Sequence, residues 1–208
     1  MIRPVAVLLL SGILIGCTGN FEKQRGISTE SSADNQPRLK KLIASTDRLV
    51  IKHFFDSVAI HDPSQGQVIT AGYCEFGPLV VYEPEKESDR LKGVRVEISS
   101  TYVRENAYSK PDKSVSFLDL DEVKDLDQAL SYMGQTEQSW IKTRPTDDIE
   151  VTFTSKDDFI AVLFPNLPAD MIVLKSGRIG TAAVRMPVEK LGELQTKLRQ
   201  VLSTLESH

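Results

Sequence analysis

Two stretches of helical spacing lie 68 residues apart in this chain, and each follows several segments that alternate apolar and polar residues. The first apolar stripe is Leu120, Val123, Leu126, Leu130 and Met133, and the second is Val188, Leu191, Leu194, Leu198, Val201 and Leu205. Residues three or four apart share one face of a helix, so both stretches are predicted to be amphipathic helices. Asp119 and Glu122 form a capping-box pattern at the start of the first helix, and Pro187 suits the first turn of the second.

The segments before each helix have the period of two that half-buried strands show. Before the first helix they are residues 49–60, 68–76, 79–82, 94–103 and 115–118. Before the second they are residues 149–154, 159–164, 171–175 and 179–185, with Ser176-Gly177 as a two-residue hairpin turn. The sequence therefore predicts an α+β fold of antiparallel sheets with two amphipathic helices.

The two sets of elements indicate a duplicated strands-then-helix unit, with possible halves at residues 39–140 and 145–208. A sheet that carries one helix exposes an apolar face when it is alone, so residues 39–208 are expected to form a single domain. The order of elements resembles that of whirly-type single-stranded DNA binders, and the likeness covers this order alone. It implies a single-stranded nucleic-acid binder if the lipid anchor described next is wrong. A net charge of -4 and a pI near 5.5 count against such a partner, and no nucleic acid is expected.

Residues 1–16 have the pattern of a signal peptide. Arg3 supplies a positive charge, and residues 4–15 form an apolar run interrupted by Ser11 and Gly12. A helix that spans a bilayer needs about 20 apolar residues, whereas this chain turns polar at Cys17. Membrane spanning is therefore not expected.

Leu14-Ile15-Gly16-Cys17, at the end of the apolar run, resembles the lipobox of bacterial lipoproteins. The resemblance implies that the Cys17 sulfur carries diacylglycerol, that the chain is cut before Cys17, and that the new amine is acylated. Thr18 rather than Asp follows the cysteine, which in Gram-negative members implies the periplasmic side of the outer membrane; a Gram-positive source implies the cell membrane. An ordinary secretory signal with an incidental cysteine and a buried N-terminal strand are the alternatives.

Residues 17–38 are predicted to be the lipidated cysteine and a flexible tether, because only Phe21, Ile27 and Ala33 are apolar between residues 18 and 38. A coil of this length has an end-to-end distance of about 25 Å. Removal of residues 1–16 also removes Arg3, leaving 24 basic against 29 acidic side chains, a net charge of -5. Cys74 is then the only free thiol, and its apolar neighbours predict a buried small hydrophobe.

A hydrolytic site is the main catalytic alternative. His61 and Asp62 could form a dyad with a distant serine, but the sequence contains no Gly-x-Ser-x-Gly nucleophile elbow. Ser64 and Ser176 adjoin predicted turns and are explained by turn chemistry. A small cell-envelope hydrolase that uses His61 and Asp62 stays open, and no catalytic residue is assigned.

Metal and cofactor sites are not predicted. His53 and His61 would face the same side of one strand roughly 26 Å apart, too far to share a metal, and His208 is terminal. Val123 and Lys124 interrupt the calcium-loop pattern in the acidic set Asp119, Asp121, Glu122, Asp125 and Asp127. These carboxylates are instead favoured at a helix N-terminus by its dipole.

Modest basic groups occur on the predicted strands, namely Lys92 with Arg95, and Lys175 with Arg178 and Arg185. A solvated sheet face explains them, and a surface for an anionic ligand or lipid headgroup is the alternative. Trp140, with Lys142 and Arg144 beyond it, is expected to pack at the end of the first helix or to lie at an interface.

Together these features predict a membrane-anchored periplasmic lipoprotein that acts as a non-catalytic binding or scaffolding module. The expected partners are the lipid bilayer, through acylated Cys17, and a protein or anionic ligand of the cell envelope. No cofactor is expected.

Overall fold

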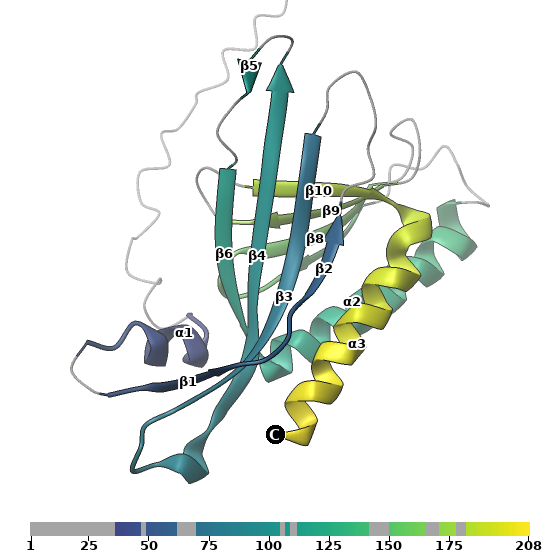
Figure 1. Ribbon diagram of the computed structural model, residues 1–208. Coiled ribbons are helices and arrows are strands. Elements are labelled where there is room, and N and C mark those ends of the chain that lie inside the picture. The colour runs from purple at the N-terminus through teal and green to yellow at the C-terminus, as the bar shows by residue number, and fades with distance from the viewer. Residues whose placement is uncertain are drawn as a thin grey trace, which may run out of the picture. The chain divides into compact units, whose positions relative to one another are not determined.

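The computed structural model places each long helix directly after an antiparallel sheet (Figure 1). It describes residues 36–46, 49–61, 70–104, 107–108, 112–141, 150–164, 171–177 and 182–208, all within one compact unit. The predicted signal peptide, Cys17 and the tether as far as residue 35 lie outside the described residues. Of the helices in the described ranges, none is both long enough and apolar enough to cross a bilayer.

The first sheet is built around two long paired strands, β3 (Thr70–Tyr82) and β4 (Leu91–Arg104), with a 3-10 turn, η2 (Glu87–Asp89), between them. The other side of β3 pairs with β1 (Ile51–Phe54) and β2 (Val58–His61). Strand β4 also pairs with β5 (Ala107–Tyr108) and β6 (Asp112–Asp119). Helix α2 (Leu120–Thr136) begins at the next residue and is followed by a π-helical turn, η3 (Glu137–Ile141).

The second sheet has its strands in chain order. These are β7 (Val151–Thr154), β8 (Phe159–Phe164), β9 (Met171–Ser176) and β10 (Ala182–Pro187), each antiparallel to its neighbour. A 3-10 turn, η4 (Val188–Lys190), then leads into helix α3 (Leu191–Ser207). In both halves of the chain, a long helix thus follows the last strand of the sheet. This confirms the predicted α+β class and the repeated order of strands and helix.

Both sheets and both helices contribute to one hydrophobic core. The strands of the second sheet lie behind those of the first in Figure 1 and run across them. Phe76 of β3 and Phe159 of β8 meet in this core edge to face, with ring centroids 6.3 Å apart. On the helices, the predicted stripe residues Leu126, Leu130 and Leu194 are at most 1% exposed. The apolar stripes therefore close the core, as the sequence predicted.

A β-bulge divides the segment that was predicted as a single strand over residues 49–60. Phe54 pairs with Leu79, whereas Val58 pairs with Phe76, so four steps along one strand oppose three along the other. The extra residue reverses the alternation of side chains between β1 and β2. The prediction that His53 and His61 face the same side is consequently wrong, because His53 lies opposite Val80 on the core face and His61 lies on the outer face.

The two segments predicted at residues 68–76 and 79–82 are one continuous strand, β3, which passes through Gly77 and Pro78. Pro78 has no N–H to donate, and this is tolerated only where the ladder is interrupted. Its carbonyl oxygen accepts a hydrogen bond from the N–H of Phe55 at 3.1 Å, so its nitrogen faces the bulge between β1 and β2. The bulge therefore allows a proline within a long strand.

The predicted two-residue turn at Ser176-Gly177 is wrong. Ser176 pairs with Ala182, which leaves residues 177–181 between β9 and β10. Gly177 has a φ of 88°, the left-handed region in which glycine is favoured. The rest of this connection lies outside the described residues.

Helix α1 (Arg38–Ile43) covers the outer face of the first sheet, opposite the main core. Leu39 is fully buried in a second apolar cluster with Leu79 and Val81. A Cβ added at Gly93 would lie 3.0 Å from the Leu39 side chain and 2.2 Å from a carbonyl oxygen of β6, so only glycine fits there. This close approach fixes the first described helix on the sheet.

Candidate functional site

Four cationic side chains from three separate parts of the chain line one cleft beside α1. Its volume is about 460 Å³, and its lining residues are Arg38, Arg90, Leu91, Lys92, Asp119, Leu120, Asp121 and Lys156. The cations come from the start of α1, the residue after η2, strand β4 and the turn between β7 and β8. We call this site the basic cleft.

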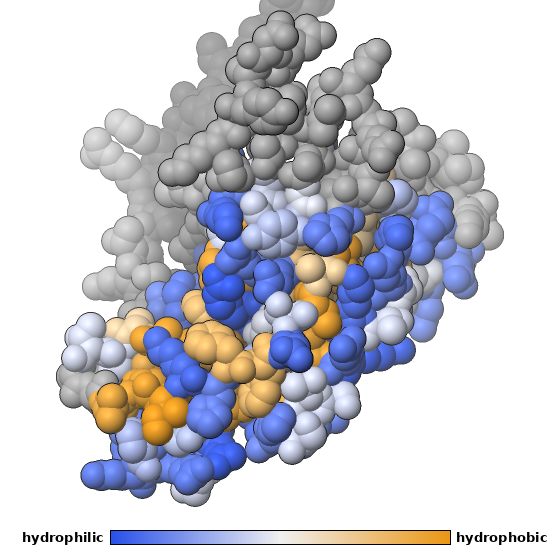
Figure 2. All heavy atoms as spheres, in the orientation of Figure 1, coloured by the Kyte–Doolittle hydropathy of each residue, from blue (hydrophilic) through white to orange (hydrophobic). Residues whose placement is uncertain are grey.

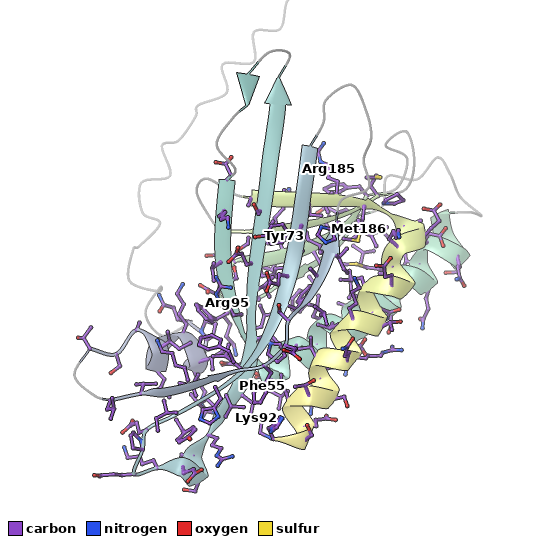
Figure 3. All side chains as sticks on the ribbon, in the orientation of Figure 1. Phe55, Tyr73, Lys92, Arg95, Arg185 and Met186 are labelled. Carbon is purple, nitrogen blue, oxygen red and sulfur yellow. The ribbon has the colours of Figure 1, made fainter. Side chains whose placement is uncertain are left out.

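Strand β4 and the loop before it hold two of these cations. Lys92 lies near the C-terminal end of α3 in Figure 3, and its Nζ donates a hydrogen bond to the carbonyl oxygen of Leu205 at 2.9 Å. Arg90 forms an ion pair with Glu87, and its guanidinium lies 5.3 Å from the ring centroid of Tyr82. Arg90 and Lys92 are therefore oriented by protein contacts before any ligand arrives.

The other two cations are freer. Lys156 Nζ lies 3.8 Å from Asp121, whose side chain is 72% exposed, so this pair is weak and solvated. Arg38 is exposed, and no ion pair joins it to another residue in the described part of the chain. Arg38 is thus the cation most available to an incoming anion.

Asp119 lines the basic cleft, but its carboxylate is already engaged. It accepts hydrogen bonds from the N–H groups of Arg38 and Leu39, each at 2.9 Å. It also takes part in a capping box at the start of α2, where the Asp119 N–H donates to Glu122 at 3.1 Å. Asp119 thereby joins the start of α1 to the start of α2.

Glu122 also serves the architecture of the cleft. Its second carboxylate oxygen accepts the N–H of Lys156 at 2.7 Å, which fixes the turn that carries the Lys156 side chain. Burial raises the pKa of Glu122 above its ordinary value, and the backbone N–H groups of Lys156 and Asp119 oppose this shift. Glu122 therefore positions Lys156 and does not face the ligand space.

The lining composition indicates anion binding. Four cationic and two anionic side chains give the cleft a local excess of two positive charges, although the chain as a whole carries -4. Partly exposed arginine and lysine side chains bind phosphate and carboxylate groups through charge-assisted hydrogen bonds. The lining contains no thiol, imidazole or hydroxyl group among the described residues.

The residues of the hydrolase alternative do not join this cleft. His61 is exposed at the end of β2, with its ring centroid 6.3 Å from that of Tyr73. Asp62 and Ser64 lie outside the described residues. Ser176 is buried rather than placed in a turn, and its Oγ lies 2.6 Å from that of Ser116 between the two sheets.

The histidines lie in three different environments. The Nε2 atom of His53 is 3.2 Å from the Tyr82 hydroxyl, and the ring of His208 stacks on Phe55 at 4.3 Å. Within the described ranges, no group of three or more His, Cys, Asp or Glu side chains could hold a metal ion. Cys74 is fully buried, as predicted, and burial raises its thiol pKa, so it is unreactive.

The acidic set at the start of α2 is divided among structural contacts. Asp119 and Glu122 form the capping box, and Asp121 lies beside Lys156. Asp127 pairs with Arg199 of α3 at 3.0 Å. Asp125 is exposed.

The predicted basic groups are only partly brought together. Lys92 and Arg95 project from opposite faces of β4, because their spacing is odd. Arg95 pairs with Glu97 at 2.5 Å, and with the Tyr73 hydroxyl this lowers the pKa of Glu97 to about 2. Lys175 lies 6.0 Å from the centroid of the Phe164 ring. Arg178, Lys142, Arg144 and the Trp140 side chain lie outside the described residues.

No protein-family model matches this chain, and no curated protein matches it in sequence.

Proposed function

We propose that this protein is a membrane-anchored lipoprotein of the cell envelope whose globular domain is a non-catalytic binding module for an anionic ligand. The convergence of Arg38, Arg90, Lys92 and Lys156 on one cleft carries this proposal. The lining holds four cations against two carboxylates in a chain that is acidic overall, so a bound anion would offset the repulsion among these cations.

The anchor is the other part of the proposal. The Leu14-Ile15-Gly16-Cys17 pattern supports acylation of Cys17, and Thr18 after it supports the periplasmic side of the outer membrane, or the cell membrane in a Gram-positive source. Two or three acyl chains hold a protein at a bilayer essentially permanently, since each buried methylene contributes about 0.8 kcal/mol. The anion site would then be held at the membrane surface.

The ligand half of the proposal is tested by titrating inorganic phosphate into the ¹⁵N-labelled, acylated protein in detergent micelles. We expect NMR shifts at the amides of Arg38, Lys92 and Lys156. The double variant Arg38→Gln/Lys156→Gln should bind phosphate at least about tenfold more weakly than the parent, because it removes the cleft's excess positive charge.

Lys190→Gln is the matched control, since Lys190 is a paired surface lysine of η4 outside the cleft. It should bind phosphate like the parent. Shifts that are absent, that map elsewhere, or that persist unchanged in the double variant would refute the basic cleft as an anion site.

A further inference from the structure

The basic cleft borders the second apolar cluster, which is buried under α1. Leu91 lines the cleft and also packs against the second apolar cluster of Leu39, Leu79 and Val81. In Figure 2, apolar residues gather at the lower left, the region where Figure 1 places α1 and β1. We call this region, made of α1, Leu49–Phe54 and the adjoining parts of β3 and β4, the arm.

The arm carries the two most exposed large hydrophobic side chains of the described residues. Leu49 is 73% exposed and Phe54 is 63% exposed. Phe54 pairs with Leu79, so its side chain lies on the same face as the apolar cluster and α1. Phe54 shares its face with the cluster that Leu91 joins to the basic cleft, whereas Leu49 lies in a separate hollow with Glu83, Pro84, Glu85 and Lys86. Exposed apolar side chains and a cationic cleft in one domain match an amphiphilic partner, which presents an anionic group next to hydrocarbon.

The charges of the arm restrict how it could meet such a partner. Glu83 and Glu87 are paired with Lys86 and Arg90, but the neighbouring Glu85 and Asp89 are exposed. A wide anionic surface would be repelled by these carboxylates. One phosphate group seated in the cleft would not be, because the excess positive charge is confined there.

The place where the chain enters the domain identifies the source of the phosphate. Arg38, the first residue of α1, follows Cys17 by 21 positions. The composition of that stretch predicts a coil of about 25 Å, so an anchored domain stays within reach of its own bilayer. A tether of the predicted length gives an effective concentration on the order of millimolar, at which even a weak headgroup site is occupied.

We propose that the basic cleft binds the phosphate of a phospholipid headgroup in the membrane that holds the anchor, with Leu49 and Phe54 entering the headgroup region. This docking rests on the proposed lipid anchor and on the anion site. It would hold the domain against the bilayer in one orientation, with the arm toward the lipid.

Depth-dependent fluorescence quenching tests the docking. The acylated chain with Leu49→Cys, labelled with a fluorophore, is reconstituted into vesicles of zwitterionic phosphatidylcholine that contain nitroxide lipid. Cys74 is fully buried and the Cys17 sulfur is acylated, so the introduced thiol alone takes the label. Tyr132→Cys, at a 58% exposed position of α2, is the matched control.

We expect the probe at position 49 to be quenched about twofold or more relative to position 132. The difference should disappear in vesicles of digalactosyldiacylglycerol, which lacks phosphate, and in Arg38→Gln/Lys156→Gln, but should persist in Lys190→Gln. Added inorganic phosphate should reverse the quenching if the cleft holds the headgroup.

Flotation of the same vesicles separates the two proposals. A chain that floats with neither vesicle has no anchor, and both proposals fail. A chain that floats with both, while positions 49 and 132 are quenched alike, keeps its anchor and overturns the docking. If inorganic phosphate nevertheless binds to that chain, the ligand is a free phosphate compound and the headgroup assignment is wrong.

Discussion

Leu194→Asp is expected to lower the melting temperature by more than ten degrees or to prevent folding. Leu194 is fully buried in the core shared by both sheets and both helices. The variant loses a buried leucine, at about 2 to 5 kcal/mol, and must bury or neutralise a carboxylate at a further cost of several kcal/mol. The whole fold is stabilised by about 5 to 15 kcal/mol. Circular dichroism during thermal unfolding measures the effect.

Leu126→Asp should behave in the same way, since Leu126 is 1% exposed on the facing helix. Thr196→Asp introduces the same charge on the exposed side of α3 and should melt within a few degrees of the parent. A melting temperature of Leu194→Asp or Leu126→Asp as high as that of this control would mean that the stripe faces solvent.

Asp119→Ala is expected to destabilise the protein by about 3 kcal/mol. The carboxylate accepts two backbone N–H groups at the start of α1 and takes part in the α2 capping box, and it is only 8% exposed. Loss of a cap costs about 1 kcal/mol, and each buried N–H left without an acceptor adds about 1 kcal/mol or more. Urea unfolding gives the difference directly.

Asp125→Ala is the control for Asp119→Ala, because Asp125 is an exposed aspartate on the same helix. It should change the unfolding free energy by no more than about 0.5 kcal/mol. Equal effects of the two substitutions would show that Asp119 does not secure α1.

The elements of this fold were well specified by local patterns. The segment at residues 159–164 coincides with β8, and the Asp119-Glu122 pattern forms the expected capping box. The stripes on α2 and α3 are buried as their spacing indicates. These features depend on residues near one another in the chain, which is why periodicity and capping rules detect them.

The errors arose where pairing partners decide the local structure. The bulge between β1 and β2 lies opposite the proline within β3 and accommodates it. Neither feature can be predicted unless the pairing register of β3 with β1 and β2 is known. Helix α1 was missed because its six residues are too few to show helical periodicity, and its stability comes from Leu39 and Asp119.

The basic cleft could be predicted only in part. Lys92 was predicted to belong to a basic group with Arg95. Side chains alternate along a strand, and the odd spacing of these two residues places them on opposite faces of β4. Arg38, Arg90 and Lys156 are far apart in the sequence and meet only because α1, β4 and the β7–β8 turn converge. Net charge is a property of the whole chain, so a pI of 5.5 did not reveal a local positive site.

The intact mass of the protein extracted from membranes tests the lipid anchor most directly. Acylation at Cys17 predicts the loss of residues 1–16 together with the added mass of diacylglycerol and, where the amine is modified, a further acyl chain. Cys17→Ser should either accumulate as the unprocessed chain or leave the membrane fraction after cleavage. An unmodified mass for the parent, or a Cys17→Ser variant with the same mass shift and the same membrane fraction as the parent, would contradict the lipid anchor.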